Sequence, residues 1–82
     1  MQDEELDLAI PDMNSQTAEE QVKKTLEALP GILAVRLIER GAFIRHRRGA
    51  ITNDEICTAI RQLGLRVSIF QDSSGRQGKS SQ

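Results

Sequence analysis

The chain has 82 residues, enough for one small domain, and 38% of them are hydrophobic and 28% charged, as in ordinary soluble globular proteins. No apolar run approaches the roughly 20 residues that a membrane-spanning helix requires, and the N-terminus lacks a secretory signal pattern. The single cysteine, Cys57, excludes an internal disulfide. We therefore expect a soluble cytoplasmic protein, or a cytoplasmic part of a larger one.

The net charge of −1 conceals an uneven distribution of charged residues. Acidic residues are concentrated in the first twenty positions, whereas the segment from Arg36 to Arg48 is mainly basic. This asymmetry predicts that opposite faces of one small domain carry opposite charge.

The first predicted element is a strand. Residues 6–10 alternate apolar with small or polar side chains at a period of two, the pattern of a half-buried strand. Pro11 ends this strand because proline cannot donate a hydrogen bond to a neighbouring strand. Residues 1–4 are mostly polar and acidic, and we expect them to be disordered.

An amphipathic helix follows the strand. Thr17, with Glu20 three residues later, matches a capping box, which places the start of the helix at Thr17. Leu29-Pro30-Gly31 ends the helix. Apolar residues spaced by four, four and three positions share one face of this helix: Ala18, Val22, Leu26 and Leu29.

The next two predicted elements are strands joined by a tight turn. Residues 32–39 form one strand, with Val35 and Leu37 on the same face. Residues 39–41 form the hairpin turn, and residues 42–47 form the second strand.

A second helix and a fourth strand complete the predicted elements. Thr52 and Glu55 form another capping box, and Gly64 ends this helix. Residues 65–70 again alternate at a period of two. Residues 72–82 contain no apolar side chain, so we expect a disordered tail or linker.

This order predicts an α+β domain over residues 5–71 with the ferredoxin-like βαββαβ arrangement. Two helices would cover one face of a four-stranded antiparallel sheet, and the other face would remain open to solvent or a partner. The predicted core is aliphatic because the chain has no Trp or Tyr and only two Phe. Its members are Leu6, Leu8, Ile10, Val22, Leu26, Leu29, Ile32, Val35, Leu37, Ala42, Ile44, Ile56, Ala59, Ile60, Leu63, Leu65, Val67 and Ile69.

The stretch between the first strand and the Pro-Gly stop resembles the heavy-metal-associated domains of copper chaperones and of the N-termini of metal-transporting P-type ATPases. Residues 12–18 read Asp-Met-Asn-Ser-Gln-Thr-Ala, where that family has Gly-Met-Thr-Cys-x-x-Cys. The interval to the Leu-Pro-Gly-Ile stop at residues 29–32 matches without a gap, and Met13 is kept. The resemblance covers roughly residues 5–71 and implies the fold of that family.

The departure from the family pattern is chemical. Ser15 and Ala18 occupy the two cysteine positions, and Asp12 replaces the leading glycine. A pair of soft thiolates is what captures Cu(I) or Zn(II) in this geometry, whereas a hydroxyl is a poor ligand and a methyl group is none. The resemblance therefore carries over the fold but neither the metal site nor any other cofactor. The degenerate motif positions are Met13, Ser15 and Ala18.

Two further residues could bind a metal or titrate. Cys57 lies next to a core position, and we interpret it as a small residue at the edge of the core. His46 is in phase with Ala42 and Ile44 and would point toward the helices as a boundary residue. Met13, His46 and Cys57 would form a soft metal site only if the fold brought them together.

The outward-facing positions of the strands form the candidate interaction surface. This surface is predicted to be basic and to contain aromatic side chains, which would suit an acidic protein or single-stranded nucleic acid. Residues 40–44 faintly resemble an RNA-recognition strand, but the first strand has no aromatic residue on which a base could stack. The predicted interaction residues are Arg36, Phe43, Arg45, Arg47, Arg66 and Phe70.

No constellation in the sequence supports catalysis, so we do not expect an enzyme. Our leading hypothesis is a degenerate heavy-metal-associated domain that acts as a protein-interaction or regulatory module, with a link to metal transport. Two alternatives stay open: a copper- or zinc-binding module with non-standard ligands, and a nucleic-acid-binding module that uses the basic face. The sequence names no protein partner and no oligomeric state.

Overall fold

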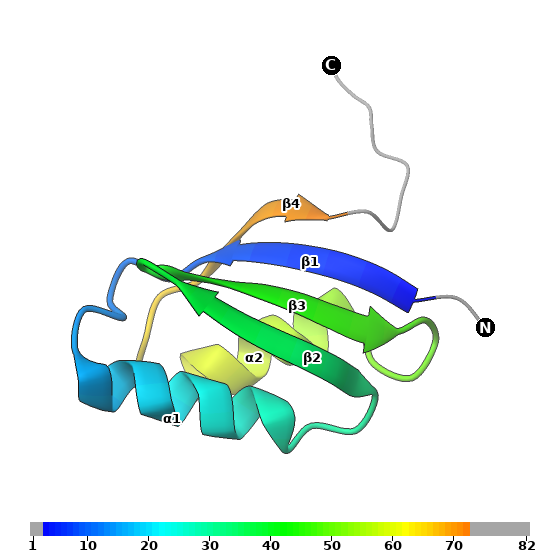
Figure 1. The fold of residues 1–82 in the computed structure, drawn as a ribbon, viewed down its shortest axis with the longest axis horizontal. Coiled ribbons are helices and arrows are strands. Elements are labelled where there is room, and N and C mark those ends of the chain that lie inside the picture. The colour runs from blue at the N-terminus through cyan, green and yellow to red at the C-terminus, as the bar shows by residue number, and fades with distance from the viewer. Residues whose placement is uncertain (1–2, 73–82) are drawn as a thin grey trace.

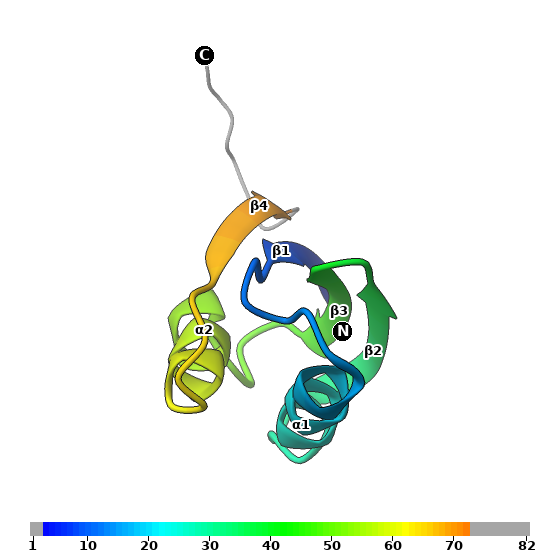
Figure 2. The same ribbon diagram turned by 90° about the vertical axis from the view of Figure 1, so that its left-hand side faces the viewer.

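The computed structural model describes residues 3–72. The elements are β1 (Asp3–Ala9), α1 (Gln16–Glu27), β2 (Ile32–Ile38), β3 (Gly41–Arg47), α2 (Asn53–Arg61) and β4 (Ser68–Asp72). The strands form one antiparallel sheet in the order β2-β3-β1-β4, and both helices lie on the same side of it (Figures 1 and 2). The predicted α+β, ferredoxin-like fold is confirmed. The predictions for residues 1–2 and 73–82 lie outside the described residues.

The first and last strands of the chain begin at different residues from those predicted. β1 starts at Asp3, because Asp3 to Glu5 pair with Arg47 to Arg45 on β3, so residues 3–4 belong to the sheet and not to a disordered end. β4 starts at Ser68 and not at residue 65, because its pairing with β1 begins where Ser68 meets Ala9.

The cap of α1 also differs from the prediction. Ser15 is the N-cap, and its Oγ accepts a hydrogen bond from the backbone N–H of Ala18 at 3.1 Å. Thr17 lies inside the helix, so the predicted capping box at Thr17 is wrong. Ser15 and Thr17 both carry a hydroxyl group that can cap a helix, and the prediction chose Thr17 because of its spacing from Glu20. The capping box of Thr52 and Glu55 is confirmed in α2.

The core lies between the sheet and the two helices, and it is aliphatic as expected. The predicted core list lacks Met13 and Ile51, which are buried. Ile69 was assigned to the core but is 42% exposed, because β4 is an edge strand with a neighbour on one side only. The fully or nearly fully buried apolar residues are Leu6, Leu8, Ile10, Met13, Val22, Leu26, Ala42, Ile44, Ile51, Ile56, Cys57 and Ile60.

Gly31 joins the end of α1 to the far end of β3. Its φ of +88° is in the left-handed region, and its carbonyl accepts a hydrogen bond of 2.7 Å from the N–H of Arg47. A Cβ at this position would lie 2.7 Å from the Cβ of Ala50. Both the backbone conformation and the lack of space therefore require glycine in the Leu-Pro-Gly-Ile stop.

Candidate functional site

The loop before α1 occupies the position of the family's metal motif. Met13 is buried, and its N–H donates to the carbonyl of Ile10 at 2.9 Å. Ser15 uses its hydroxyl oxygen as the helix cap, and Ala18 is half-buried and offers only a methyl group. Neither residue can replace a thiolate, so the residues present do not fit a Cu(I) or Zn(II) ion in the usual loop.

The other soft side chains do not complete an alternative metal site. His46 pairs with Glu4 near the start of β1, whereas Met13 follows the end of that strand. The intervening strand spans about 17 Å at the usual rise per residue. Within residues 3–72, no group of three or more His, Cys, Asp or Glu side chains could hold a metal ion. The structure therefore does not bring Met13 and His46 together.

An ion pair ties the motif loop to the segment between α2 and β4. Both carboxylate oxygens of Asp12 accept hydrogen bonds from the Arg66 side chain, at 2.8 and 3.1 Å, and one also accepts the Arg66 backbone N–H at 2.9 Å. These hydrogen bonds lower the pKa of Asp12 from its ordinary 3.8 to about 2, and they raise the pKa of Arg66. Asp12 thus fixes the loop through charge instead of supplying the flexibility of the family's glycine.

The open face is the side of the sheet that the helices leave uncovered. Phe43, Arg45 and Arg47 on β3 alternate with buried neighbours, and Arg36 on β2 lies between two partly buried ones. All four side chains therefore lie on the open face, as the sequence indicated. Arg66 does not join them, because it precedes β4 and pairs with Asp12. The interaction face predicted from the sequence therefore loses one of its cations.

The open face is not basic, because β1 contributes acids to it. Asp3 lies opposite Arg47, and Glu5 lies opposite Arg45 with its Oε2 3.4 Å from the Arg45 Nη2. The prediction that acidic and basic residues occupy opposite faces is therefore wrong. The antiparallel pairing of β1 with β3 brings the two charge groups side by side, and the sequence alone did not reveal this pairing.

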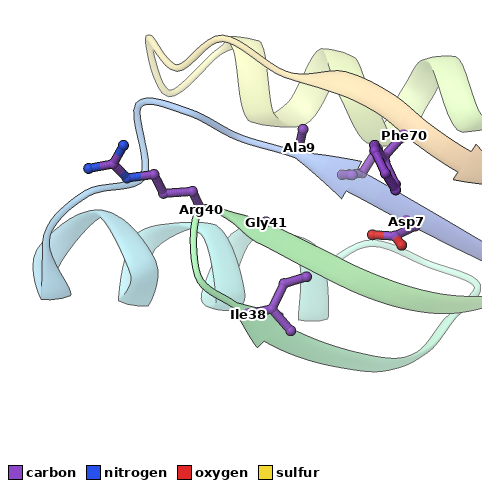
Figure 3. Close-up of a pocket in the computed structure, with 7 residues that line it drawn as sticks. Asp7, Ala9, Ile38, Arg40, Gly41 and Phe70 are labelled. Carbon is purple, nitrogen blue, oxygen red and sulfur yellow. The ribbon is translucent and has the colours of Figure 1, made fainter.

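A pocket of about 220 Å³ lies on the open face at the hairpin end of the sheet. We call it the open-face pocket; its lining residues are Asp7, Leu8, Ala9, Ile38, Arg40, Gly41 and Phe70. Figure 3 shows Ile38 on β2 and Phe70 on β4, on either side of Gly41 and Ala9. Ile38 and Phe70 are 47% and 74% exposed, so large apolar side chains flank small residues here.

The shape of the open-face pocket depends on two local features. A Cβ on Gly41 would lie 2.7 Å from the carbonyl oxygen of Leu8, so only glycine leaves this floor flat. Leu8 pairs with Ile69 and Asp7 pairs with Gln71, which leaves Phe70 as the extra residue of a bulge. Bulges commonly redirect side chains, and this one accompanies the unusual exposure of Phe70.

A second polar cluster lies at the other end of the sheet, around Glu4. One Glu4 carboxylate oxygen is 4.0 Å from the Nε2 of His46, and the other is 3.4 Å from the Nε of Arg48. His46 is 1% exposed, and neither ring nitrogen has a hydrogen-bond partner among the described residues. His46 is therefore buried toward the helices, as its position on β3 indicated.

Cys57 lies on the buried side of α2. Its side chain is 3% exposed, and burial raises the pKa of its thiol, opposed by the nearby charge of Arg61. A buried thiol with a raised pKa is a weak nucleophile and a weak metal ligand. This placement agrees with the structural interpretation of Cys57 as a core residue.

Several solved structures have the same arrangement of helices and strands. Oxidized MerP from Ralstonia metallidurans CH34 superposes with a TM-score of 0.81 at 19% identity, over 85% of this chain and 100% of that chain. The chain has the fold of the heavy-metal-associated domains. No protein-family model and no curated protein sequence matches it.

Two further structures with the heavy-metal-associated fold come from copper transporters. One is the N-terminal domain of a potential copper-translocating P-type ATPase from Bacillus subtilis in the Cu(I)-loaded state, with a TM-score of 0.79 at 12% identity, covering 95% of this chain and 100% of that chain. The other is the yeast copper transporter domain Ccc2a, with a TM-score of 0.74 at 24% identity, covering 85% and 99% respectively. At these identities the comparisons establish the fold alone.

Within residues 3–72, no helix has the length and apolar character needed to cross a membrane.

The open-face pocket was not predicted from the sequence, and neither were Asp7 and Gly41 as lining residues. One signal was available: Leu6 and Leu8 face the core, so Glu5 and Asp7 had to face outward. The bulge at Phe70 had no comparable signal in the sequence.

Proposed function

We propose that this chain is a non-catalytic module with the heavy-metal-associated fold that recognises a protein partner through the open face of its sheet. The open-face pocket carries the proposal, because it places the exposed Phe70 and Ile38 around a recess of about 220 Å³. Exposed large apolar side chains that border a concave site are typical of protein-binding surfaces. We place its role in metal transport, since similar solved structures are domains of copper transporters.

The motif loop supports a role other than metal capture. Ser15 caps the helix, Ala18 has no donor atom, and the Asp12–Arg66 ion pair holds the loop in place. This chain therefore keeps the scaffold of the fold while the chemistry of its loop has changed.

A metal titration tests whether the motif loop has lost the ability to bind a metal ion. Under reducing conditions, Cu(I) or Zn(II) is expected to leave the backbone amide resonances of residues 13–18 unchanged. The matched positive control is Ser15→Cys with Ala18→Cys, which restores the thiolate pair and is expected to bind one Cu(I). Saturable, stoichiometric shifts in the natural chain would contradict the proposal; their loss in Cys57→Ser would then favour a metal module with altered ligands.

A comparison of surface variants tests whether the open-face pocket binds a protein partner. Proteins captured from cell extract by the natural chain are expected to be lost with Phe70→Glu and retained with Leu33→Glu. Leu33 is the matched control, because it is an exposed apolar strand residue (42%) that does not line the open-face pocket. Equal capture by both variants would exclude the open-face pocket as the binding surface.

The structure does not favour the nucleic-acid alternative. Such binding requires a net positive surface, since contacts to phosphates supply most of the affinity. Here Arg45 is paired with Glu5, and Arg47 lies opposite Asp3. The charges of the open face are thus largely balanced.

A further inference from the structure

Asp7 differs from Glu4 and Glu5, the acidic residues that precede it on β1. Glu5 is paired with Arg45 at 3.4 Å, and Glu4 with Arg48 at 3.4 Å. Asp7 is half-buried, yet its carboxylate has no hydrogen bond or ion pair among the described residues. Its cross-strand neighbours are uncharged, because Phe43 lies opposite on β3 and Gln71 opposite on β4.

The surroundings of Asp7 favour an external cation. A partly buried carboxylate loses hydration, and an ion pair compensates this loss when the partner cation is also shielded from water. Phe43 and Phe70 are the two aromatic residues of the chain, and Asp7 lies directly across from one and lines the open-face pocket with the other. Aromatic faces attract an ammonium or guanidinium group as well.

Asp7 also sets a direction along the open-face pocket. Asp7 lies at one end and Arg40 at the other, with Ala9 and Gly41 between them, and the Arg40 side chain points away from the centre (Figure 3). A bound segment would thus meet negative charge at one end, an apolar recess in the middle and positive charge at the other end.

We propose that the open-face pocket binds a segment of a partner protein in which a large apolar side chain lies next to an arginine or lysine. The apolar side chain enters between Ile38 and Phe70, and the cation reaches Asp7. An acidic or neutral residue lies toward Arg40. This inference rests on the proposed function and specifies the chemistry of the partner.

Residues 73–82 do not match this segment. They contain Arg76 and Lys79 but no apolar side chain. We therefore assign the occupant to a partner protein.

A random heptapeptide library displayed on phage tests the proposal with residues 1–82 as bait. We expect enriched peptides to contain a large apolar residue with Arg or Lys two to four positions away. Binding of these peptides is expected to weaken about tenfold with Asp7→Asn, the effect of removing one charge-assisted contact at a shielded site. Asp54→Asn is the control, since Asp54 is an exposed carboxylate in the first turn of α2 and should leave binding unchanged.

A charge reversal at Asp7 tests directly whether this residue selects the basic side chain of the peptide. Selection against Asp7→Lys is expected to enrich Glu or Asp in place of the basic residue, with circular dichroism confirming that the variant is folded. Peptides that require Phe70 but are insensitive to Asp7 would overturn this inference and leave the proposed function standing. A library without enrichment, or with peptides that bind equally to Phe70→Glu, would count against both. Concentration-dependent self-association that is lost with Phe70→Glu would assign the surface to a second copy and overturn the proposed segment.

Discussion

Gly31 offers the sharpest test of the structural reasoning, because two other glycines serve as controls. Gly31, Gly49 and Gly64 all have φ between +84° and +88°. A Cβ at Gly31 would meet the Cβ of Ala50 at 2.7 Å, whereas a Cβ at Gly49 or Gly64 would have nothing within 4 Å. Substitution by alanine thus imposes the same backbone conformation at all three positions, and a steric conflict at only one.

The expected magnitudes follow from these two contributions. Gly49→Ala and Gly64→Ala should each lower the free energy of unfolding by about 1–2 kcal/mol, the cost of a left-handed conformation for an L-residue. Gly31→Ala should cost a further ~1–3 kcal/mol, because a carbon contact of 2.7 Å is far below the optimum and a Cβ cannot rotate away. The total of about 2–5 kcal/mol is a large part of the stability of a small domain.

Urea unfolding followed by far-ultraviolet circular dichroism measures these differences. Ala50→Gly in the Gly31→Ala background removes the conflicting atom and is expected to restore most of the additional ~1–3 kcal/mol. Equal costs for Gly31→Ala and Gly49→Ala, or no recovery with Ala50→Gly, would refute the argument that close packing of the loop against Gly31 requires glycine there.

Three further predictions concern charge, reactivity and packing. The pKa of Asp12 is depressed from 3.8 to about 2 in the folded chain, so its contribution to stability is present above pH 4 and is lost as the pH falls toward 2. In Asp12→Asn, the free energy of unfolding should therefore fall less between pH 4 and pH 2 than in the natural chain. If urea unfolding gives the same pH dependence for both proteins, the interaction with Arg66 does not stabilise the fold. The Cys57 thiol should react with Ellman's reagent only when the fold opens, so the rate should rise steeply with urea; rapid reaction in native buffer would contradict its burial. Ile44→Ala should cost about 2–5 kcal/mol and Ile69→Ala less than about 1 kcal/mol, since Ile44 is fully buried and Ile69 is 42% exposed; equal costs in urea unfolding would restore the sequence assignment of Ile69 to the core.

The elements of this fold could be predicted because each depends on local sequence. The hydrophobic period of α1, the Thr52–Glu55 box and the alternation in β3 are read from neighbouring residues. The N-cap was placed wrongly because Ser15 and Thr17 carry equivalent hydroxyl groups, and only the backbone shows which one begins the helix.

The candidate site was harder to predict because it depends on the pairing of strands distant in sequence. The period of β3 placed Arg45 on the open face, but that pattern contains no information about Glu5, which is 40 residues away. The bulge that frees Phe70 arises from the pairing of β4 with β1 and not from the sequence of β4 alone. The open-face pocket therefore became visible only once the register was known.

Gly41 has a consequence for how this surface can change during evolution. Gly41 lines the open-face pocket, and a Cβ at this position would lie 2.7 Å from the carbonyl oxygen of Leu8. Substitution of Gly41 would disturb the sheet, so selection for folding alone preserves the recess. Ile38 and Phe70 are exposed and face no such constraint. The recess is therefore maintained together with the fold, whereas substitutions at Ile38 and Phe70 can change which side chains it binds.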